Sequence, residues 1–266
     1  MAALLLPSAR ALLRTSAVGP AVRRPARGLA NVVRARLDEL AEDRGEAEVL
    51  QYEGMKWTVC EAKKYADGLA AGLGELAVGN GDAVATLIPG DAPESHCGQI
   101  AAASAGFVYV SIDPALGADA ARRPRRRPFF FPPHTPLVPQ VRDALAETGA
   151  KVVIHSGSEA DVALLEAAVP EFGGHAARKA APFHSPAAPS LKYFVSTGLD
   201  MHPASSNYQH LLAVDGPKPS GDVADDALLY VAYGAGGVEK FSHKEVVQQN
   251  VFPALSAVLH VEHATF

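Results

Sequence analysis

The segment GNGDAVATLIPGDAPESHCGQIAAASAGFVYVSIDP, residues 79–114, decides the fold. Its glycine-rich start turns the chain, and the apolar run that follows, ended by Pro89, has the length of a buried strand. A helix rich in small residues is expected over 94–105, and a second apolar strand ends at Asp113 and Pro114. A strand, a helix and a strand in this order predict two parallel strands joined by a crossover helix.

The segments on either side continue this alternation. Upstream, Thr58 is the expected N-cap of a helix, with Glu61 placed as in a capping box. Downstream we expect, in order, helix 138–150, strand 151–156, helix 159–169, strand 191–197, a loop over 197–222, and a strand, glycine turn and helix within 225–250. The sequence therefore predicts an α/β fold, in which helices flank both faces of a parallel sheet.

The N-terminal segment has a composition of its own. Residues 1–30 are rich in Ala, Leu and Ser and lack acidic residues, and their basic side chains are Arg10, Arg14, Arg23, Arg24 and Arg27. These features are typical of a mitochondrial transit peptide, and a basic tail that binds an acidic partner is the alternative. The expected location is therefore the mitochondrion, in the matrix or at the matrix face of the inner membrane.

The rest of the chain divides into two parts. Residues 31–50 predict an exposed lead-in helix, and residues 51–266 predict one α/β domain. Residues 120–137 interrupt this domain with arginines, prolines and phenylalanines, which suit a partner-binding loop, a contact with acidic lipid headgroups, a solvated loop or an artefact of the gene model.

Charge and cysteine content exclude several classes of function. Without the N-terminal arginines, the 29 acidic residues outnumber the basic ones, which disfavours nucleic-acid binding. Cys60 and Cys97 provide neither a disulfide framework nor a metal-ligand spacing. No apolar run is long enough for a membrane span, so we expect membrane association only through partners.

The order of the segments resembles the N-terminal part of the adenylate-forming, AMP-binding superfamily of acyl-CoA synthetases. The resemblance runs over about 51–260 without the insertion, and it is carried by Trp57, Thr58, Gly79, Gly81, Asp82, Pro89, Ala105, Gly106, Asp113 and Pro114. It implies the fold of the N-terminal subdomain of these enzymes. It also implies an ATP-phosphate loop near residue 235.

That loop departs from the family pattern. The family has Tyr-Thr-Ser-Gly-Thr-Thr-Gly-x-Pro-Lys-Gly and then Ser-His, whereas this chain has AYGAGGVEKFSH. The positions that match are Gly234, Gly237, Lys240, Ser242 and His243. The serine and threonine hydroxyls that donate to phosphate are replaced by Tyr233, Ala235 and Gly236, and Glu239 adds a negative charge. The resemblance therefore implies a degenerate loop, and we expect no bound cofactor.

Other candidate sites have simpler explanations. GAGG lacks the third glycine of a dinucleotide motif and the Lys-Ser/Thr ending of a Walker A loop. His260 and His263 share a helix face without further ligands, and the neighbours His96 and Cys97 point in different directions on a helix. Ser185 and Ser196 lie in no catalytic motif. We therefore expect no catalytic residue and no metal site.

The resemblance also sets the expected function. The family's acyl-pocket, ribose-binding and lid motifs would follow Phe266, so the chain is expected to be a truncated, non-catalytic relative. The leading hypothesis is an accessory protein subunit of a mitochondrial complex, with a respiratory-chain complex or the ATP synthase as host. Two alternatives are an acyl-CoA- or nucleotide-binding protein and a fragment of an acyl-CoA ligase.

Overall fold

The computed structural model describes residues 29–52, 54–112, 137–177, 181–199, 202–216, 223–234 and 237–260. Nearly all of the predicted transit peptide 1–30 and of the insertion 120–137 lies outside these ranges. None of the helices in the described part is long and apolar enough to cross a membrane.

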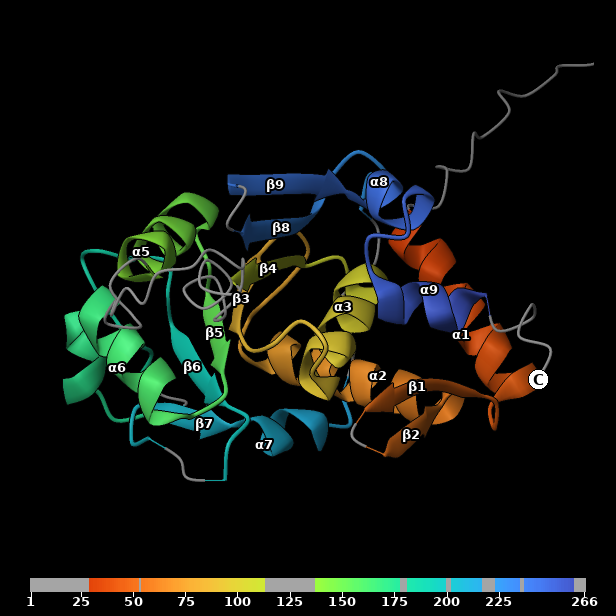
Figure 1. Cartoon of the computed structure of the whole chain (residues 1–266), viewed down its shortest axis with the longest axis horizontal. Coiled ribbons are helices and arrows are strands. Elements are labelled where there is room, and N and C mark those ends of the chain that lie inside the picture. Colours follow the sequence, from red (N-terminus) through yellow and green to blue (C-terminus); the bar gives the residue numbers. More distant parts are fainter. Residues whose placement is uncertain are drawn as a thin grey trace, which may run out of the picture.

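A seven-stranded sheet forms the centre of the molecule (Figure 1). Its order is β7-β6-β5-β3-β4-β8-β9, and every neighbouring pair is parallel except β8 and β9. The strands are β3 (Ala83–Leu87), β4 (Val108–Ile112), β5 (Val152–His155), β6 (Tyr193–Ser196), β7 (Ser205–Asn207), β8 (Leu228–Gly234) and β9 (Gly237–Ser242). The predicted α/β fold is thus confirmed, with one antiparallel strand at the edge.

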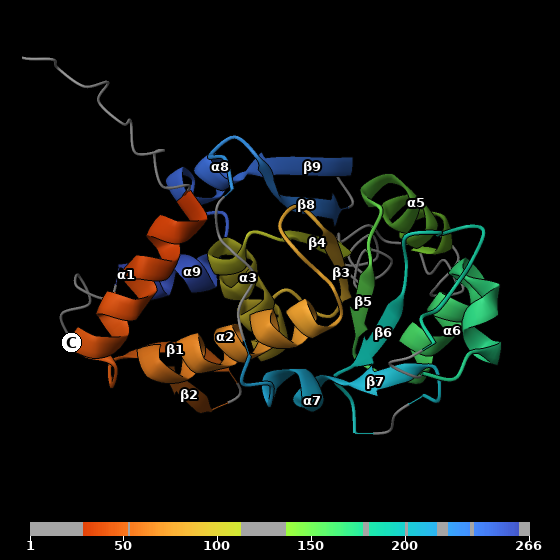
Figure 2. The ribbon, with the colours of Figure 1, turned by 180° about the vertical axis from the view of Figure 1, so that it is seen from behind.

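Helices cover both faces of the sheet because the central strands are apolar on both sides. One face packs against α2 (Val59–Glu75), α3 (Pro93–Ala105) and α9 (Pro253–Leu259), and α1 (Leu29–Arg44) lies outside them (Figure 2). The other face packs against α5 (Leu137–Thr148), α6 (Glu159–Ala168) and the short 3₁₀ helix Pro170–Gly174. β3 is buried at all five residues, as expected for a strand between two helical layers.

The predicted capping box at the start of α2 is confirmed. The Thr58 hydroxyl accepts a hydrogen bond from the Glu61 amide, and the Glu61 carboxylate accepts one from the Thr58 amide. The two partners are only three residues apart, so the sequence alone specifies this contact.

Three predictions of local structure were wrong in part. The lead-in helix expected over 31–50 is present as α1 (Leu29–Arg44), but it ends earlier and is not exposed on every side, since Val33, Leu37 and Leu40 are buried. The chain then forms a small antiparallel pair, β1 (Glu48–Tyr52) with β2 (Met55–Thr58). The chain turns at Gly45, which lies too close to Cys60 for a side chain larger than hydrogen. The loop over 197–222 contains β7 and α7 (Tyr208–Leu212), because buried Tyr208 and Leu211 anchor this segment on α2.

The third correction concerns the glycine turn. It leads into the antiparallel strand β9, and α8 (His243–Gln248) starts only after that strand. Residues 237–240 are exposed, and the adjacent charged side chains of Glu239 and Lys240 suit a strand at the edge of a sheet.

Candidate functional site

The glycine turn lies at the tip of the β8–β9 hairpin. Gly234 pairs with Gly237 at the end of the ladder, and Gly237 has a positive φ of 113° that a larger residue would rarely adopt. Ala235 and Gly236 fall outside the described residues. Of the positions that match the family loop, the hairpin brings Gly234 and Gly237 together.

Lys240 and Ser242 lie along β9, away from the tip. Lys240 is three residues beyond Gly237, or about 10 Å at the rise of a strand, and Ser242 is about 17 Å away. Ser242 is the N-cap of α8, where its hydroxyl donates to Glu245 Oε2 at 2.8 Å and accepts from the Glu245 amide at 3.3 Å. Its hydroxyl therefore belongs to the helix start rather than to the turn.

The Tyr233 hydroxyl is also engaged. Tyr233 replaces the family serine, and its Oη donates to Glu147 Oε2 of α5 at 3.0 Å. Burial, together with the carboxylates of Glu147 and Asp143, raises the pKa of Tyr233 to about 12. The phenol is thus a neutral donor whose hydrogen bond is already used by Glu147 of α5.

Glu239 and Lys240 do not form the ion pair that their adjacency suggests. Successive residues of a strand point to opposite faces of the sheet, and the register sets Glu239 opposite Ala232 and Lys240 opposite Val231. Both side chains are exposed, and within the described ranges no salt bridge joins them. Lys240 is therefore a solvated cation on an exposed strand.

The remaining predicted candidates have structural roles. Cys97 is buried, and burial raises the pKa of its thiol to about 12, so it is not a nucleophile at neutral pH. Burial lowers the pKa of its neighbour His96. His260 bonds back to Ser256 at the end of α9, while His263 lies outside the described residues. In the described part of the chain, no group of three or more His, Cys, Asp or Glu residues could hold a metal ion.

Ser185, Ser196 and His243 also have local explanations. The Ser185 hydroxyl donates to Glu171 Oε2 at 3.0 Å, and the Ser196 hydroxyl accepts from the Gly198 amide at 3.2 Å. His243 is the first residue of α8 and is buried, which lowers the pKa of its imidazole.

One buried polar contact was not predicted from the sequence. His155 of β5 and Ser205 of β7 meet with an Nε2–Oγ distance of 2.8 Å, and Nδ1 of His155 accepts from the Gly157 amide at 3.1 Å. Nδ1 is therefore unprotonated, and Nε2–H donates to Ser205. A serine hydrolase needs the reverse arrangement, with Nε2 accepting from the serine and Nδ1 donating to a carboxylate. The pair is structural.

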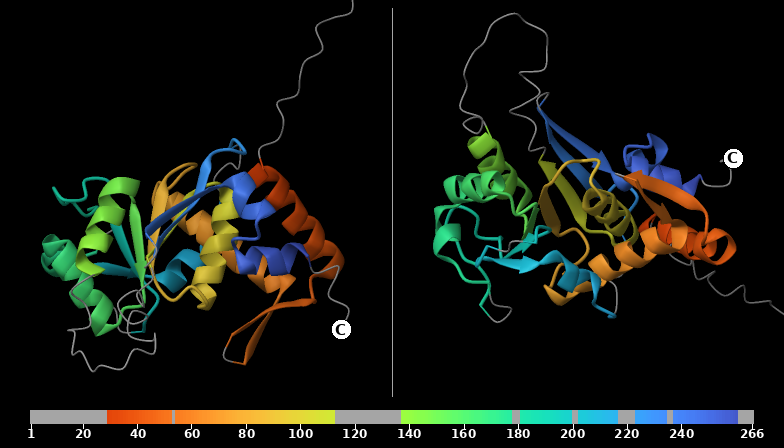
Figure 3. Two further views of the ribbon diagram at one scale, coloured as in Figure 1. Left: turned by 45° about the horizontal axis from the view of Figure 1, so that its top comes forward. Right: turned by 60° about the horizontal axis from the view of Figure 1, so that its bottom comes forward.

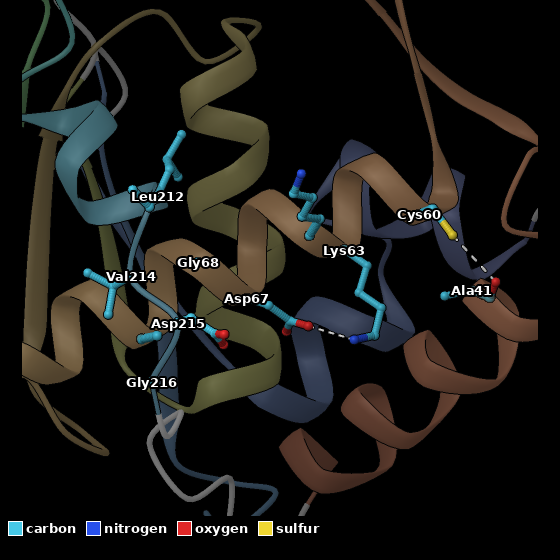
Figure 4. A pocket seen from close by; sticks show the side chains of 12 residues that line it. Ala41, Cys60, Lys63, Asp67, Gly68, Leu212, Val214, Asp215 and Gly216 are labelled. Carbon is cyan, nitrogen blue, oxygen red and sulfur yellow. Dashed lines mark hydrogen bonds and ion pairs between the residues drawn. The ribbon is translucent and has the colours of Figure 1, made fainter.

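A further pocket, drawn in Figure 4, has no residue of the hairpin in its lining. It has a volume of about 570 Å³ and lies between α2, the end of α7 and residues 213–216. Lys63 on its wall forms ion pairs with Asp67 and, at 2.8 Å, with Asp38. Burial lowers the pKa of Lys63, but both carboxylates outweigh this effect and raise it. The charge of Lys63 is therefore already paired with carboxylates, whereas Lys64, which also lines the pocket, is exposed.

The chain matches a known protein family. The model of the AMP-binding enzyme family matches residues 37–236. No curated protein is similar to the chain at a significant level.

Solved structures share the fold at low sequence identity. The anthranilate CoA ligase AuaEII, solved with anthranoyl-AMP, is 16% identical with a TM-score of 0.60, over 83% of this chain and 36% of that one. A fatty acyl CoA synthetase from Mycobacterium tuberculosis is 17% identical with a TM-score of 0.59, over 88% and 43% of the two chains. The N-terminal domain of FACL13 from Mycobacterium tuberculosis is 20% identical with a TM-score of 0.56, over 81% and 45%.

The chain thus spans less than half the length of these similar structures. The family match, by contrast, covers most of the present sequence, from α1 to the glycine turn. This chain belongs to the AMP-binding enzyme family.

Proposed function

We propose that the chain is a non-catalytic member of this family that acts as a structural subunit of a mitochondrial assembly, with a respiratory-chain complex or the ATP synthase as host. The observation that supports the loss of adenylation is the state of the hydroxyls around the turn. Tyr233 donates to Glu147 and Ser242 caps α8, while residues 234–240 contain no serine or threonine.

The expected effect on nucleotide binding is large. A hydrogen bond to a charged group contributes roughly 1.5 kcal/mol or more, so three missing donors weaken phosphate binding by about 4.5 kcal/mol, or roughly a thousandfold. Glu239 lies two residues after Gly237 and adds repulsion toward a polyphosphate.

A titration with nucleotide tests this part of the proposal. Isothermal titration of the purified chain with MgATP, up to millimolar concentration, is expected to give no saturable heat. The matched variant restores the family hydroxyls by Tyr233→Ser, Ala235→Thr and Gly236→Thr. Micromolar binding by the unmodified chain would overturn the proposal and favour a retained nucleotide-binding role, and the same titration with an acyl-CoA tests the acyl-CoA alternative.

The mitochondrial part rests on the composition of residues 1–30, with arginines and without acidic residues. The test is the native mass at which the chain migrates from gently solubilised mitochondria. We expect it in a large membrane complex at fixed stoichiometry with the same neighbours. Migration at monomer mass would contradict the structural role, and co-purified adenylation activity would favour the ligase-fragment alternative.

A further inference from the structure

No strand of the described part of the chain pairs with the outer edge of β9. β9 is the last strand of the sheet (Figure 3), and its residues 237–240 are exposed. Gly234 and Gly237 are paired across a two-residue turn, and such a closing pair is hydrogen-bonded. From this pair onward, hydrogen-bonded and non-hydrogen-bonded residue pairs alternate along the two strands. The backbone groups of Gly237, Glu239 and Phe241 therefore point to β8, whereas those of Val238 and Lys240 point away from the sheet.

This free edge has a defined end. The amide of Ser242, next in the outward series, donates to Glu245 Oε2 at 2.8 Å in the capping box of α8. At the opposite edge of the sheet, β7 is only three residues long and leads directly into α7. Among the described strands of the large sheet, β9 therefore offers the longer edge, with the donors and acceptors of Val238 and Lys240 available to a further strand.

The charges on β9 disfavour a second copy of the chain as that further strand. If two copies of the chain joined their sheets through β9, the two-fold axis that relates them would be perpendicular to the sheet. Each side chain would then stay on its own face of the sheet, so odd-numbered residues of one copy would pair with odd-numbered residues of the other. The two registers that overlap most of the strand are centred on Glu239 or on Lys240, and each sets a charged residue against its own copy. Every other symmetric register pairs about half of the strand or less.

We propose that β9 receives one strand from a different polypeptide, added along Val238 and Lys240. This strand presents an acidic side chain opposite Lys240 and a basic one opposite Glu239, which complements the charges on the two faces. It also presents an apolar residue opposite Val238, which is 46% exposed. This inference rests on the proposed structural role, since the added strand would be a contact that joins the chain to its assembly.

Residue-resolved hydrogen exchange tests the inference. In the isolated chain, the amides of Val238 and Lys240 are expected to exchange rapidly, while those of Glu239 and Phe241, bonded to β8, exchange slowly. In the native assembly, exchange at Val238 and Lys240 should slow by about 100-fold or more, whereas Glu239 and Phe241 change little.

The variant Val238→Pro removes the outward donor without removing a bond to β8, and Val238→Thr is its matched control because it keeps the amide. We expect the proline variant, checked by slow exchange at Glu239 and Phe241, to lose at least about tenfold in incorporation, and the threonine variant to incorporate normally.

Three results would overturn the inference and differ in meaning. If the chain migrates within a complex but Val238 and Lys240 exchange as in the isolated chain, only the strand addition fails. If these amides are already protected in the isolated chain, a segment of the same chain or, where protection rises with concentration, a second copy occupies the edge. If the chain migrates alone, the structural role fails as well.

Discussion

At the scale of single residues, the motif positions of the family shape turns and helix ends. Gly106 ends α3 with φ at 84°, and the Asp82 carboxylate accepts from the Gly79 amide at 2.8 Å and pairs with Lys151. Such residues are needed for the fold itself, which explains why the family pattern is recognisable here although the residues of the phosphate loop differ from it.

Gly106→Ala is expected to destabilise the protein by about 1–2 kcal/mol from backbone strain alone. An added Cβ would also lie 2.4 Å from Cγ2 of Val223, so the total loss should be larger. Gly81→Ala is the matched control, since Gly81 has φ at 76° but nothing within 4 Å of an added Cβ. Urea unfolding measures both; equal losses would show that the contact with Val223 costs nothing.

His155 makes stability depend on pH. It is fully buried, and burial, with a smaller effect of His202, lowers the pKa of its imidazole to about 4. The unfolded chain takes up this proton near pH 6.5 and the folded chain only near pH 4, so stability falls as the pH drops through this window. The expected loss is about 3 kcal/mol.

The variant His155→Gln isolates this contribution. It should lower stability at pH 7 and flatten the decline between pH 6.5 and pH 4, because the group that takes up this proton is gone. The slope that remains comes from the other histidines with lowered pKa values, which are unchanged. Urea unfolding at several pH values gives both slopes. Parallel curves for the two proteins would show that another group causes the decline.

At the scale of elements, α7 is held by two glycines of α2. A Cβ at Gly68 would lie within 2.4 Å of the Leu212 carbonyl oxygen, and one at Gly72 within 2.5 Å of the Leu211 carbonyl oxygen. These neighbours are backbone atoms that cannot rotate away. The short α7 therefore depends on the absence of side chains on this part of α2.

The substitution Gly72→Ala distinguishes helix propensity from packing by the sign of its effect on stability. Helix propensity alone would make alanine more stabilising by about 1 kcal/mol, whereas displacement of α7 should cost about 1–3 kcal/mol. We expect net destabilisation in urea unfolding, and a gain in stability would show that α7 does not pack tightly on α2.

The elements that were predicted and those that were missed differ in the range of their contacts. The capping box at Thr58 and the strand 83–87 follow from residues a few positions apart. α7 has only five residues, too few for a helical period, and the His155–Ser205 contact joins two strands that flank β6. The β8–β9 hairpin was missed because the glycine turn was interpreted through the composition of a phosphate loop, and residues 238–241 show no alternation of apolar and polar residues that would indicate a strand.

At the scale of the whole molecule, the sequence predicts the architecture better than the function. Alternating apolar segments and helices specify a two-sided α/β sheet, and the family match agrees with it. Of the positions expected to surround a phosphate, Gly234 ends β8, while Gly237, Lys240 and Ser242 are spread along β9, since a strand extends about 3.4 Å for each residue. The motif identified the residues that match the phosphate loop, but it did not show how far apart they lie in space.

The position of β4 has a consequence for the time before the protein is complete. β4 pairs with β3, its close neighbour in the chain, and with β8, which begins only at Leu228. While the polypeptide is being synthesised or imported into a compartment, the second edge of this apolar strand has no partner strand until β8 emerges. Such an interval favours aggregation, so we expect chaperone dependence to be greatest between the emergence of β4 and that of β8.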